Sequence, residues 1–288
     1  MQRFTPKNWL AQIEKHQVTF TISISSQLEN ILWELEKTKA DLSSLRSIVS
    51  CCALLKNEIK MRLIEEMKCE FHECYGASEV GVISNLTPED AVRKLHTVGT
   101  AVPGVEIRIA DSEKNPVPTG EIGEIASKSI MCFSRYYNNE QATKESIVDS
   151  YFYTGDMGYL DEEGYLVFSG RKKEMIITGG TNVYPKDVES VISQHGKVKE
   201  CVVIGLEDKQ LGEAILAVVI PEEGVALTGR ELQIHCLHRL ADYQQPLAYE
   251  FVDDFPRTEL GKVIKRKLVE QRQGYDLTEG LRAALKKS

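Results

Sequence analysis

The first 75 residues combine two hydrophobic patterns. Apolar side chains recur at helical spacing in residues 9–18, 28–35 and 59–67, and short apolar runs occupy residues 19–24 and 45–49. Short runs of this kind, placed between helices, are typical of buried parallel strands. The pattern therefore predicts α/β structure, with a partial parallel sheet and covering helices.

The pattern changes between residues 97 and 170. The β-rich runs at 105–109, 122–127 and 165–168 are short, and prolines and glycines interrupt the chain around them. Short strands with frequent turn residues are typical of antiparallel sheets and small barrels. We expect a small β-barrel-like subdomain in this part of the chain.

The last part of the chain mixes both kinds of element. Pro185 begins a predicted helix, residues 200–205 and 214–220 are predicted strands, and residues 232–240 form a further predicted helix. This order favours a separate, small α+β domain. The predicted division is residues 1–170 for the first domain, 171–272 for the second domain and 273–288 for a tail.

Composition narrows the class of protein. Hydrophobic residues make up 42% of the 288 residues and charged residues 27%, as in ordinary soluble globular proteins. The net charge of −8 argues against a nucleic-acid-binding surface. No apolar run approaches membrane-spanning length, and the N-terminus lacks the apolar core of a signal peptide. Seven cysteines, an odd number, indicate reduced thiols and a cytoplasmic location.

Candidate chemistry is concentrated in residues 153–185. The small pair Thr154-Gly155 predicts a tight turn that presents the Asp156 carboxylate to a ligand, and a carboxylate suits a vicinal diol. A hairpin tip at residues 161–164 would return Arg171 beside it, and a guanidinium fits ribose and phosphate oxygens. Considered alone, the fragment could equally be a surface hairpin with an Asp–Arg salt bridge.

A second candidate segment is Tyr75-Gly76-Ala77-Ser78-Glu79. Its aromatic face can stack on adenine, its hydroxyl can bond a phosphate oxygen, and its carboxylate can hold Mg²⁺. Considered alone, the same five residues could form a loop with a helix cap.

Three motifs in a fixed order carry a family resemblance. They are residues 75–79, residues 153–171, with fifteen residues from Asp156 to Arg171, and residues 256–262. In this order the chain resembles the adenylate-forming enzymes, which include acyl-CoA synthetases, luciferase-like enzymes and peptide-synthetase adenylation domains. The resemblance runs from about residue 4 to about residue 267, and residues 179–189 are more similar to CoA ligases than to peptide-synthetase domains.

The resemblance implies a role for each candidate residue. It implies a set that binds the nucleotide, a Mg²⁺ ligand, a catalytic lysine, a hinge, and a strand that faces CoA. These are Tyr75, Gly76, Ser78, Asp156, Phe168 and Arg171 for the nucleotide, Glu79 for Mg²⁺, Lys262 for catalysis, Lys173 for the hinge, and Gly179 and Gly180 for CoA. Without it, Phe168 could equally well pack in the core, and Lys173 and Lys262 would by default be solvated surface charges.

The implied reaction has two steps and uses ATP, Mg²⁺ and CoA. A carboxylic acid attacks the α-phosphorus of Mg-ATP, which gives acyl-AMP and pyrophosphate while Lys262 neutralises developing charge. The small domain then turns about Lys173, and the thiol of CoA attacks the acyl carbon. The sequence does not specify which acid is used.

Two features depart from the family pattern. The first glycine is Gly76, so residues 1–75 cannot form the glycine-rich phosphate loop that the family carries upstream. We therefore expect a truncated or split enzyme, with a possible partner chain that supplies the missing part, or else a non-catalytic remnant that keeps a nucleotide-binding surface. Cys51 and Cys52 replace two glycines, and their side chains should obstruct adenine and disfavour a positive φ angle.

The cysteines of this region raise a further possibility. Cys51, Cys52, Cys69, His72 and Cys74 are close in sequence, as zinc ligands can be. Their spacings match no usual pair of ligand clusters, which favours buried or pocket-lining thiols. Cys74 comes directly before the 75–79 motif and is expected to face the acyl pocket.

Overall fold

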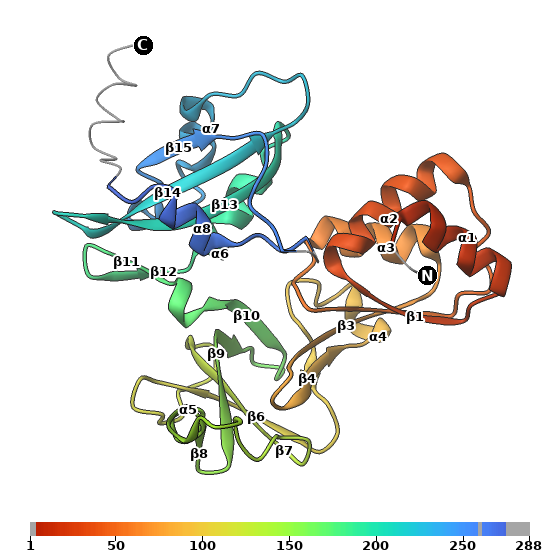
Figure 1. Cartoon of the computed structure of the whole chain (residues 1–288), viewed down its shortest axis with the longest axis horizontal. Coiled ribbons are helices and arrows are strands. Elements are labelled where there is room, and N and C mark those ends of the chain that lie inside the picture. Colours follow the sequence, from red (N-terminus) through yellow and green to blue (C-terminus); the bar gives the residue numbers. More distant parts are fainter. Residues whose placement is uncertain (1–3, 259–260, 275–288) are drawn as a thin grey trace. The chain divides into compact units, whose positions relative to one another are not determined.

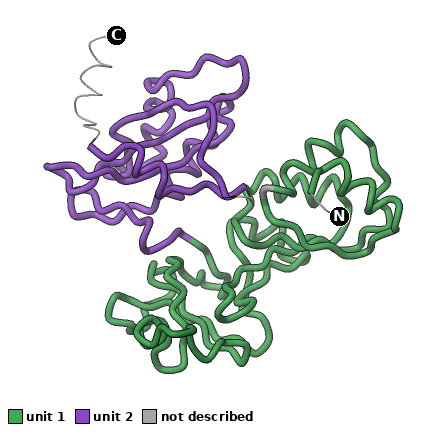
Figure 2. Tube along the Cα trace, in the orientation of Figure 1, with its two compact units in different colours: residues 1–168 green, residues 169–288 purple. Residues whose placement is uncertain are grey.

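The computed structural model describes residues 4–258 and 261–274. The chain divides into two compact units, Met1–Phe168 and Ser169–Ser288 (Figure 2). In the described ranges, no helix is both long enough and apolar enough to cross a membrane. Residues 275–288 of the predicted tail lie outside the described residues, and the functional division of the chain into domains stays a prediction.

The first unit begins with a five-stranded sheet and three helices (Figure 1). The strands, in spatial order, are β1 (Phe20–Ile24), β2 (Ser47–Cys51), β3 (Glu70–Ala77), β4 (Gly81–Leu86) and β5 (Thr100–Ala101). The helices are α1 (Pro6–His16), α2 (Ser25–Thr38) and α3 (Asn57–Met67). Strands β1, β2 and β3 are parallel because α2 and α3 provide the crossover connections between them.

Local sequence signals explain where α1 begins and ends. The Thr5 side chain accepts a hydrogen bond from the Asn8 amide at 3.2 Å, and Pro6 occupies the first turn, where no amide donor is needed. The helix ends at Gln17, which takes the left-handed conformation with φ of 50°. Its apolar stripe then joins the core of the first unit.

One face of this sheet is packed against the three helices. The shared core contains Trp9, Leu10, Ile13, Leu28, Ile31, Leu32, Ile48, Leu63, Met67 and Phe71. The opposite face is much more open. Phe20 and Ile22 of the edge strand are 54% and 59% exposed, and Ile22 is in register with Val49 and His72, which are only half-buried.

A second sheet completes the first unit and forms an open half-barrel. Its spatial order is β10 (Leu166–Arg171), β9 (Tyr151–Leu160), β7 (Gly123–Ser129) and β6 (Val105–Ala110), and β8 (Ile147–Val148) pairs with β9. The short helix α5 (Glu140–Ser146) lies between β7 and β8, whereas the short helix α4 (Pro88–Ala91) lies between β4 and β5 of the first sheet. Strand β10 extends past Phe168, so the division between the units falls within it.

The second unit is a mixed sheet with an apolar core on each face. The strands are β11 (Ile176–Thr178), β12 (Thr181–Val183), β13 (Val198–Asp208), β14 (Gly212–Pro221) and β15 (Ala248–Phe251), with spatial order β12-β11-β14-β13 and β15 paired with β14. The helices are α6 (Pro185–Ser193), α7 (Gly229–Cys236) and α8 (Lys265–Glu270), and the 3₁₀ helices are η1 (Lys172–Glu174) and η2 (Asp242–Gln244).

The alternation of β13 and β14 explains the two cores. Val203 and Ala217 are cross-strand neighbours that face α6 and α7, whereas the adjacent residues Ile204 and Leu216 face Phe255 and α8.

The predicted fold class is confirmed by this architecture. It is an α/β sheet with covering helices and a small β subdomain, followed by an α+β unit. One helix is shorter than predicted. The helix expected over residues 232–240 ends at Cys236 because His238 has φ of 87°, which no helix interior can contain.

Candidate functional site

Asp156 lies at an irregularity inside strand β9. The pairing with β7 shifts between Glu124↔Met157 and Ala126↔Tyr153, so β9 carries extra residues there. Gly155 has φ of 72° within this bulge. The tight turn expected at Thr154-Gly155 takes the form of this bulge, and the strand continues through it to Leu160.

Neighbouring polar groups hold the bulge in shape. The Gly155 amide donates to Glu124 Oε1 at 3.1 Å, and the Asp156 amide donates to Thr154 Oγ1 at 3.1 Å. The Thr154 hydroxyl donates to the Ile125 carbonyl at 2.8 Å. Glu124, which is 8% exposed, was not a predicted site residue, since a glutamate in a strand carries no sequence signal for this role.

Tyr75 joins the two sheets of the first unit at this bulge. Its hydroxyl donates to Asp156 Oδ2 at 2.8 Å and lies 3.4 Å from Thr154 Oγ1. Asp156 is only 9% exposed, so this hydrogen bond stabilises a carboxylate that is nearly buried.

Phe168 gives the same region an apolar wall. Its ring centroid lies 6.0 Å from that of Tyr75, with the ring planes tilted by 53°. Both rings pack against a cluster that includes Ile109, Ile125 and Leu166. The structure therefore connects the three predicted residues through Tyr75, whose hydroxyl bonds Asp156 and whose ring lies near Phe168.

Ser78 and Glu79 lie in the turn that joins β3 to β4, and no helix begins there. Ser78 is exposed, and Glu79 Oε1 accepts a hydrogen bond from the Tyr136 hydroxyl at 3.0 Å. Burial, followed by this hydrogen bond, raises the pKa of Tyr136. The Glu79 carboxylate is a hard oxygen ligand at the surface, which suits Mg²⁺ bound through one carboxylate and substrate phosphates.

Gly76 has a structural reason to be glycine. A β-carbon at this position would lie 2.2 Å from the Gly81 carbonyl oxygen of the facing strand. The close approach of β3 and β4 therefore requires a residue without a side chain, whether or not a nucleotide also approaches it.

The remaining predicted site residues belong to the second unit. Arg171 ends β10, and Lys173 is exposed in η1. Gly179 and Gly180 form the turn between β11 and β12 with φ of 56° and 79°, and the Gly179 amide donates to the Leu211 carbonyl at 2.8 Å. Their assigned roles stay predictions.

Lys262 is exposed and follows Gly261, which has φ of 83°. The Lys262 amide donates to Thr258 Oγ1 at 3.2 Å, and the Thr258 amide donates to the Lys262 carbonyl at 2.8 Å. These bonds fix the backbone on both sides of the loop, while residues 259–260 of the predicted motif lie outside the described residues. The catalytic role of Lys262 stays a prediction.

A buried ion pair next to Tyr75 was not predicted. Lys60 of α3 is 1% exposed and pairs with Glu73 of β3, and its ammonium also donates to the Leu95 carbonyl at 2.6 Å. Glu73 Oε1 accepts a hydrogen bond from the Leu55 amide at 3.1 Å. The pair fixes β3 two residues before Tyr75, and a lysine in an amphipathic helix gives no sequence sign of such burial.

The cysteine region differs from expectation in one respect. Cys52 has φ of 71°, although a side chain was expected to disfavour a positive φ angle. Cys52 thus has a backbone conformation that is typical of glycine, although it carries a side chain. Among the described residues, no group of three or more His, Cys, Asp or Glu side chains could hold a metal ion.

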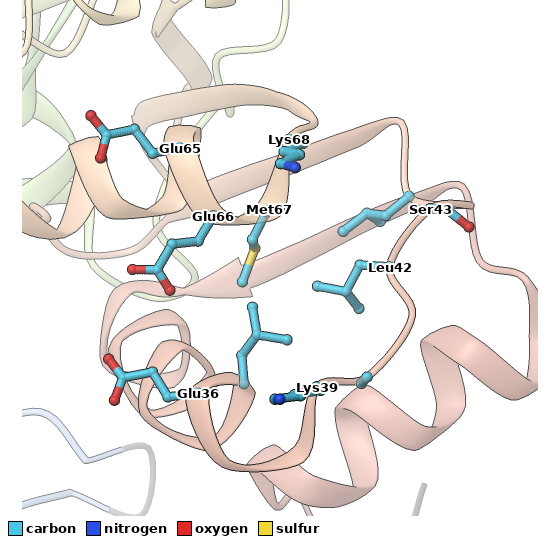
Figure 3. Close-up of a pocket in the computed structure, with 11 residues that line it drawn as sticks. Glu36, Lys39, Leu42, Ser43, Glu65, Glu66, Met67 and Lys68 are labelled. Carbon is cyan, nitrogen blue, oxygen red and sulfur yellow. The ribbon is translucent and has the colours of Figure 1, made fainter.

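A separate pocket lies between the C-terminal ends of α2 and α3. It has a volume of about 520 Å³, and Figure 3 shows Leu42 and Met67 pointing into it, with charged side chains around them. Its lining residues are Leu35, Glu36, Lys39, Ala40, Leu42, Ser43, Leu45, Glu65, Glu66, Met67 and Lys68. None of the predicted site residues is among them.

Fold and site together define a class of protein. The chain has a helix-covered α/β sheet, a bulged strand with a carboxylate bonded by a tyrosine, and an α+β unit. Such features suit an enzyme that binds a nucleoside-like ligand.

Comparison with known families identifies the chain more closely. Residues 1–137 match the AMP-binding enzyme family, and residues 187–262 match the AMP-binding enzyme C-terminal domain. The chain is 37% identical to indoleacetate–CoA ligase of Aromatoleum aromaticum, covering 88% of this chain and 50% of that protein. It is 33% identical to a long-chain-fatty-acid–CoA ligase of Bacillus subtilis, covering 94% and 49%.

Solved structures show the same likeness. ATP-bound MatB from Rhodopseudomonas palustris has a TM-score of 0.89 at 31% identity, covering 95% of this chain and 54% of that one. The amide bond synthetase McbA from Marinactinospora thermotolerans has a TM-score of 0.89 at 30% identity, covering 95% and 56%. The chain belongs to the adenylate-forming family of AMP-binding enzymes. It spans about half the length of the curated relatives it matches.

Proposed function

We propose that this chain is part of an ATP-dependent acyl-CoA ligase. In this proposal a carboxylic acid reacts with ATP to give acyl-AMP and pyrophosphate, and the acyl group then passes to the thiol of CoA. The observation that carries the proposal is the Tyr75–Asp156 hydrogen bond of 2.8 Å beside Phe168, in a chain of the AMP-binding family. Similarity to ligases for indoleacetate and long-chain fatty acids supports a carboxylic acid as substrate.

The described geometry supports a nucleoside position at the bulge. Asp156 is assigned to the ribose diol, because a carboxylate suits a vicinal diol and the bulge places this one beside Tyr75. The Tyr75 and Phe168 rings offer apolar faces for adenine. We assign phosphate contacts to Ser78 and Arg171.

Mg²⁺ fits the exposed turn that carries Glu79. The carboxylate there is oriented by the Tyr136 hydroxyl, and a single carboxylate is enough when substrate phosphates supply further oxygens. Bound Mg²⁺ would neutralise phosphate charge.

We assign the residues that move during the reaction to the second unit. We assign Lys262 to charge stabilisation during adenylation, Lys173 to the hinge, and the Gly179-Gly180 turn to the CoA side. Hydrogen bonds to Thr258 hold the backbone at Lys262, while its side chain is exposed. This combination suits a lysine that must reach a reacting group. The cytoplasm stays our proposed compartment.

The proposal is tested by carboxylate-dependent ATP–pyrophosphate exchange. Short, medium, long-chain and aromatic acids are compared with wild type, Lys262→Ala and the exposed control Lys199→Ala. We expect exchange with at least one class of acid, a loss of about 100-fold or more in Lys262→Ala, and no change in the control. Conversion of preformed acyl-AMP to acyl-CoA tests the second step, and the absence of both activities would contradict catalysis by this chain alone.

A second candidate function is that of a subunit that needs a partner chain. It is favoured by the open sheet face, where Phe20 and Ile22 are 54% and 59% exposed on an edge strand. Parallel sheets are usually covered on both faces, so this face suits a further layer of α/β structure. The partner would supply the glycine-rich phosphate loop that residues 4–75 do not contain.

This alternative has its own test. The chain is mixed with the first half of the indoleacetate–CoA ligase, and binding and exchange are measured together. A complex with restored exchange, lost in Phe20→Asp/Ile22→Asp, would favour a subunit. Exchange by this chain alone would favour the first proposal.

A further inference from the structure

Cys51 and Cys52 form a pair of adjacent thiols at the end of β2. The Cys52 thiol donates a hydrogen bond to Cys51 Sγ, with the two sulfur atoms 3.5 Å apart. The positive φ angle of 71° at Cys52 bends the backbone as the strand ends. Adjacent cysteines in an extended strand would project to opposite faces, so this bend accounts for the short distance between the thiols.

The two thiols differ in their surroundings. Cys52 is exposed to solvent, whereas Cys51 is half-buried on the sheet. Burial, together with the hydrogen bond from Cys52, raises the pKa of Cys51 to about 11. Cys52 is therefore the thiol that an oxidant in solution meets first, and Cys51 is a protonated neighbour within reach of it.

We propose that Cys51 and Cys52 form a reversible disulfide with each other when the chain meets a hydroperoxide. The Cys52 thiolate attacks one peroxide oxygen, the O–O bond breaks, and Cys52 becomes a sulfenic acid as the first water leaves. Cys51 sulfur then attacks the Cys52 sulfur, the S–O bond breaks, and a second water carries off the hydroxyl group and the Cys51 proton. Two thiols lose two electrons, and hydrogen peroxide is reduced to two waters.

The adjacency of the residues makes this disulfide a switch and not a structural bridge. Consecutive Cα atoms lie about 3.8 Å apart, which is below the usual range of about 4.4–6.8 Å for disulfides. Strained and exposed disulfides are easily reduced and are typical of regulation. The closeness of the two thiols also compensates for the small thiolate fraction of Cys51.

The residues that follow connect the dithiol to the candidate nucleotide site. The Ala53 carbonyl accepts a hydrogen bond from Ser25, and the Leu55 amide donates to Glu73 at 3.1 Å. Leu54, between them, packs in the cluster that contains Tyr75 and Phe168. A disulfide that restrains Cys52 should therefore change the position of Leu54 against these rings. This consequence rests on the proposed function, whereas formation of the disulfide does not.

The disulfide is tested directly on the full chain. Reduced protein is treated with hydrogen peroxide, unfolded, alkylated with iodoacetamide and mapped by mass spectrometry. We expect a peptide that has lost two hydrogen atoms and carries no alkyl group on Cys51 or Cys52, and we expect a reducing agent to restore both alkylation sites. Cys52→Ser should abolish the product, and Cys74→Ser should leave it unchanged.

Several outcomes would overturn the proposal. These are full alkylation of both residues after peroxide, a sulfinic acid at Cys52, and a disulfide to Cys69, Cys74 or a second chain. Hydrogen exchange of the Leu55 amide provides a second measurement on the same samples, because its bond to Glu73 reports the loop. A rate that changes on oxidation in wild type and stays constant in Cys52→Ser supports the link, and none of these measurements requires catalytic activity.

Discussion

The hydroxyl of Tyr75 joins the first sheet to the Asp156 bulge. We predict that Tyr75→Phe lowers the free energy of unfolding by about 1–3 kcal/mol, since it leaves a nearly buried carboxylate without this donor. Urea denaturation measures the change. Tyr151→Phe is the matched control, because its hydroxyl bonds Glu106 at the surface. Equal effects of the two substitutions would show that the Tyr75 contact has no special weight.

Nucleotide affinity isolates the role of the carboxylate itself. We expect Asp156→Ala to weaken AMP binding by about tenfold or more, since hydrogen bonds to a charged acceptor contribute about 1.5–3 kcal/mol. Titration calorimetry measures the affinity, with Asp111→Ala as a control in an exposed loop. An unchanged affinity would remove Asp156 from the proposed site.

The buried Lys60–Glu73 pair gives a third prediction at the scale of residues. Lys60→Met should destabilise the first unit by about 3–5 kcal/mol, because it removes the positive charge that pairs with the almost fully buried Glu73 carboxylate. Lys144→Met, in an exposed pair with Glu140, should change stability by less than about 1 kcal/mol. Urea denaturation compares the two. A small effect at Lys60 would mean that Glu73 is hydrated or protonated once its partner is lost.

The hairpin of β3 and β4 is sensitive to a small substitution at Gly76. Gly76→Ala places a methyl group 2.2 Å from the Gly81 carbonyl oxygen, so the strands must separate. We expect a loss of about 2 kcal/mol or more in stability, measured by thermal and urea denaturation. Gly196→Ala is the control, since nothing lies within 4 Å of its added β-carbon. Normal stability of Gly76→Ala would show that the hairpin tolerates the shift.

The elements show why parts of the structure were predictable and others were not. Residues 1–70 have a regular hydrophobic period, so their helices and strands could be predicted to within a few residues. The bulge at Asp156 could not, because Thr154-Gly155 allows a reversal or a bulge equally well, and only pairing with Glu124 and Ala126 decides between them. The Lys60–Glu73 pair was missed for a similar reason, since burial depends on partners distant in sequence.

The residues of the candidate site also include some that the sequence could predict and some that it could not. Tyr75, Asp156 and Phe168 were predicted as one site, and the structure brings them together. The prediction of a shared site came from the family resemblance, because no local sequence pattern connects residue 75 with residue 156. Glu124 could not be predicted, because a glutamate within a strand gives no sequence sign of its hydrogen bond from the Gly155 amide.

At the scale of the whole molecule, the two faces of the first sheet differ in how well they are covered, and this difference affects self-association. Three helices cover one face, while Phe20 and Ile22 leave an apolar edge on the other. An exposed, apolar edge strand is a template for association with another chain. We predict that Phe20→Lys/Ile22→Lys reduces concentration-dependent self-association, measured by analytical ultracentrifugation, with little change in the unfolding free energy.

The control for this prediction is a second exposed apolar residue outside the edge strand. Ile130 is 98% exposed, so Ile130→Lys changes charge and apolar surface without touching β1. If association falls equally in both variants, net charge and not the sheet edge is responsible. If it falls only in the β1 variant, the open face is the surface of contact, and the same variant should also fail to bind a partner half. The self-association measurement and the partner-binding measurement would then identify one surface by two independent routes.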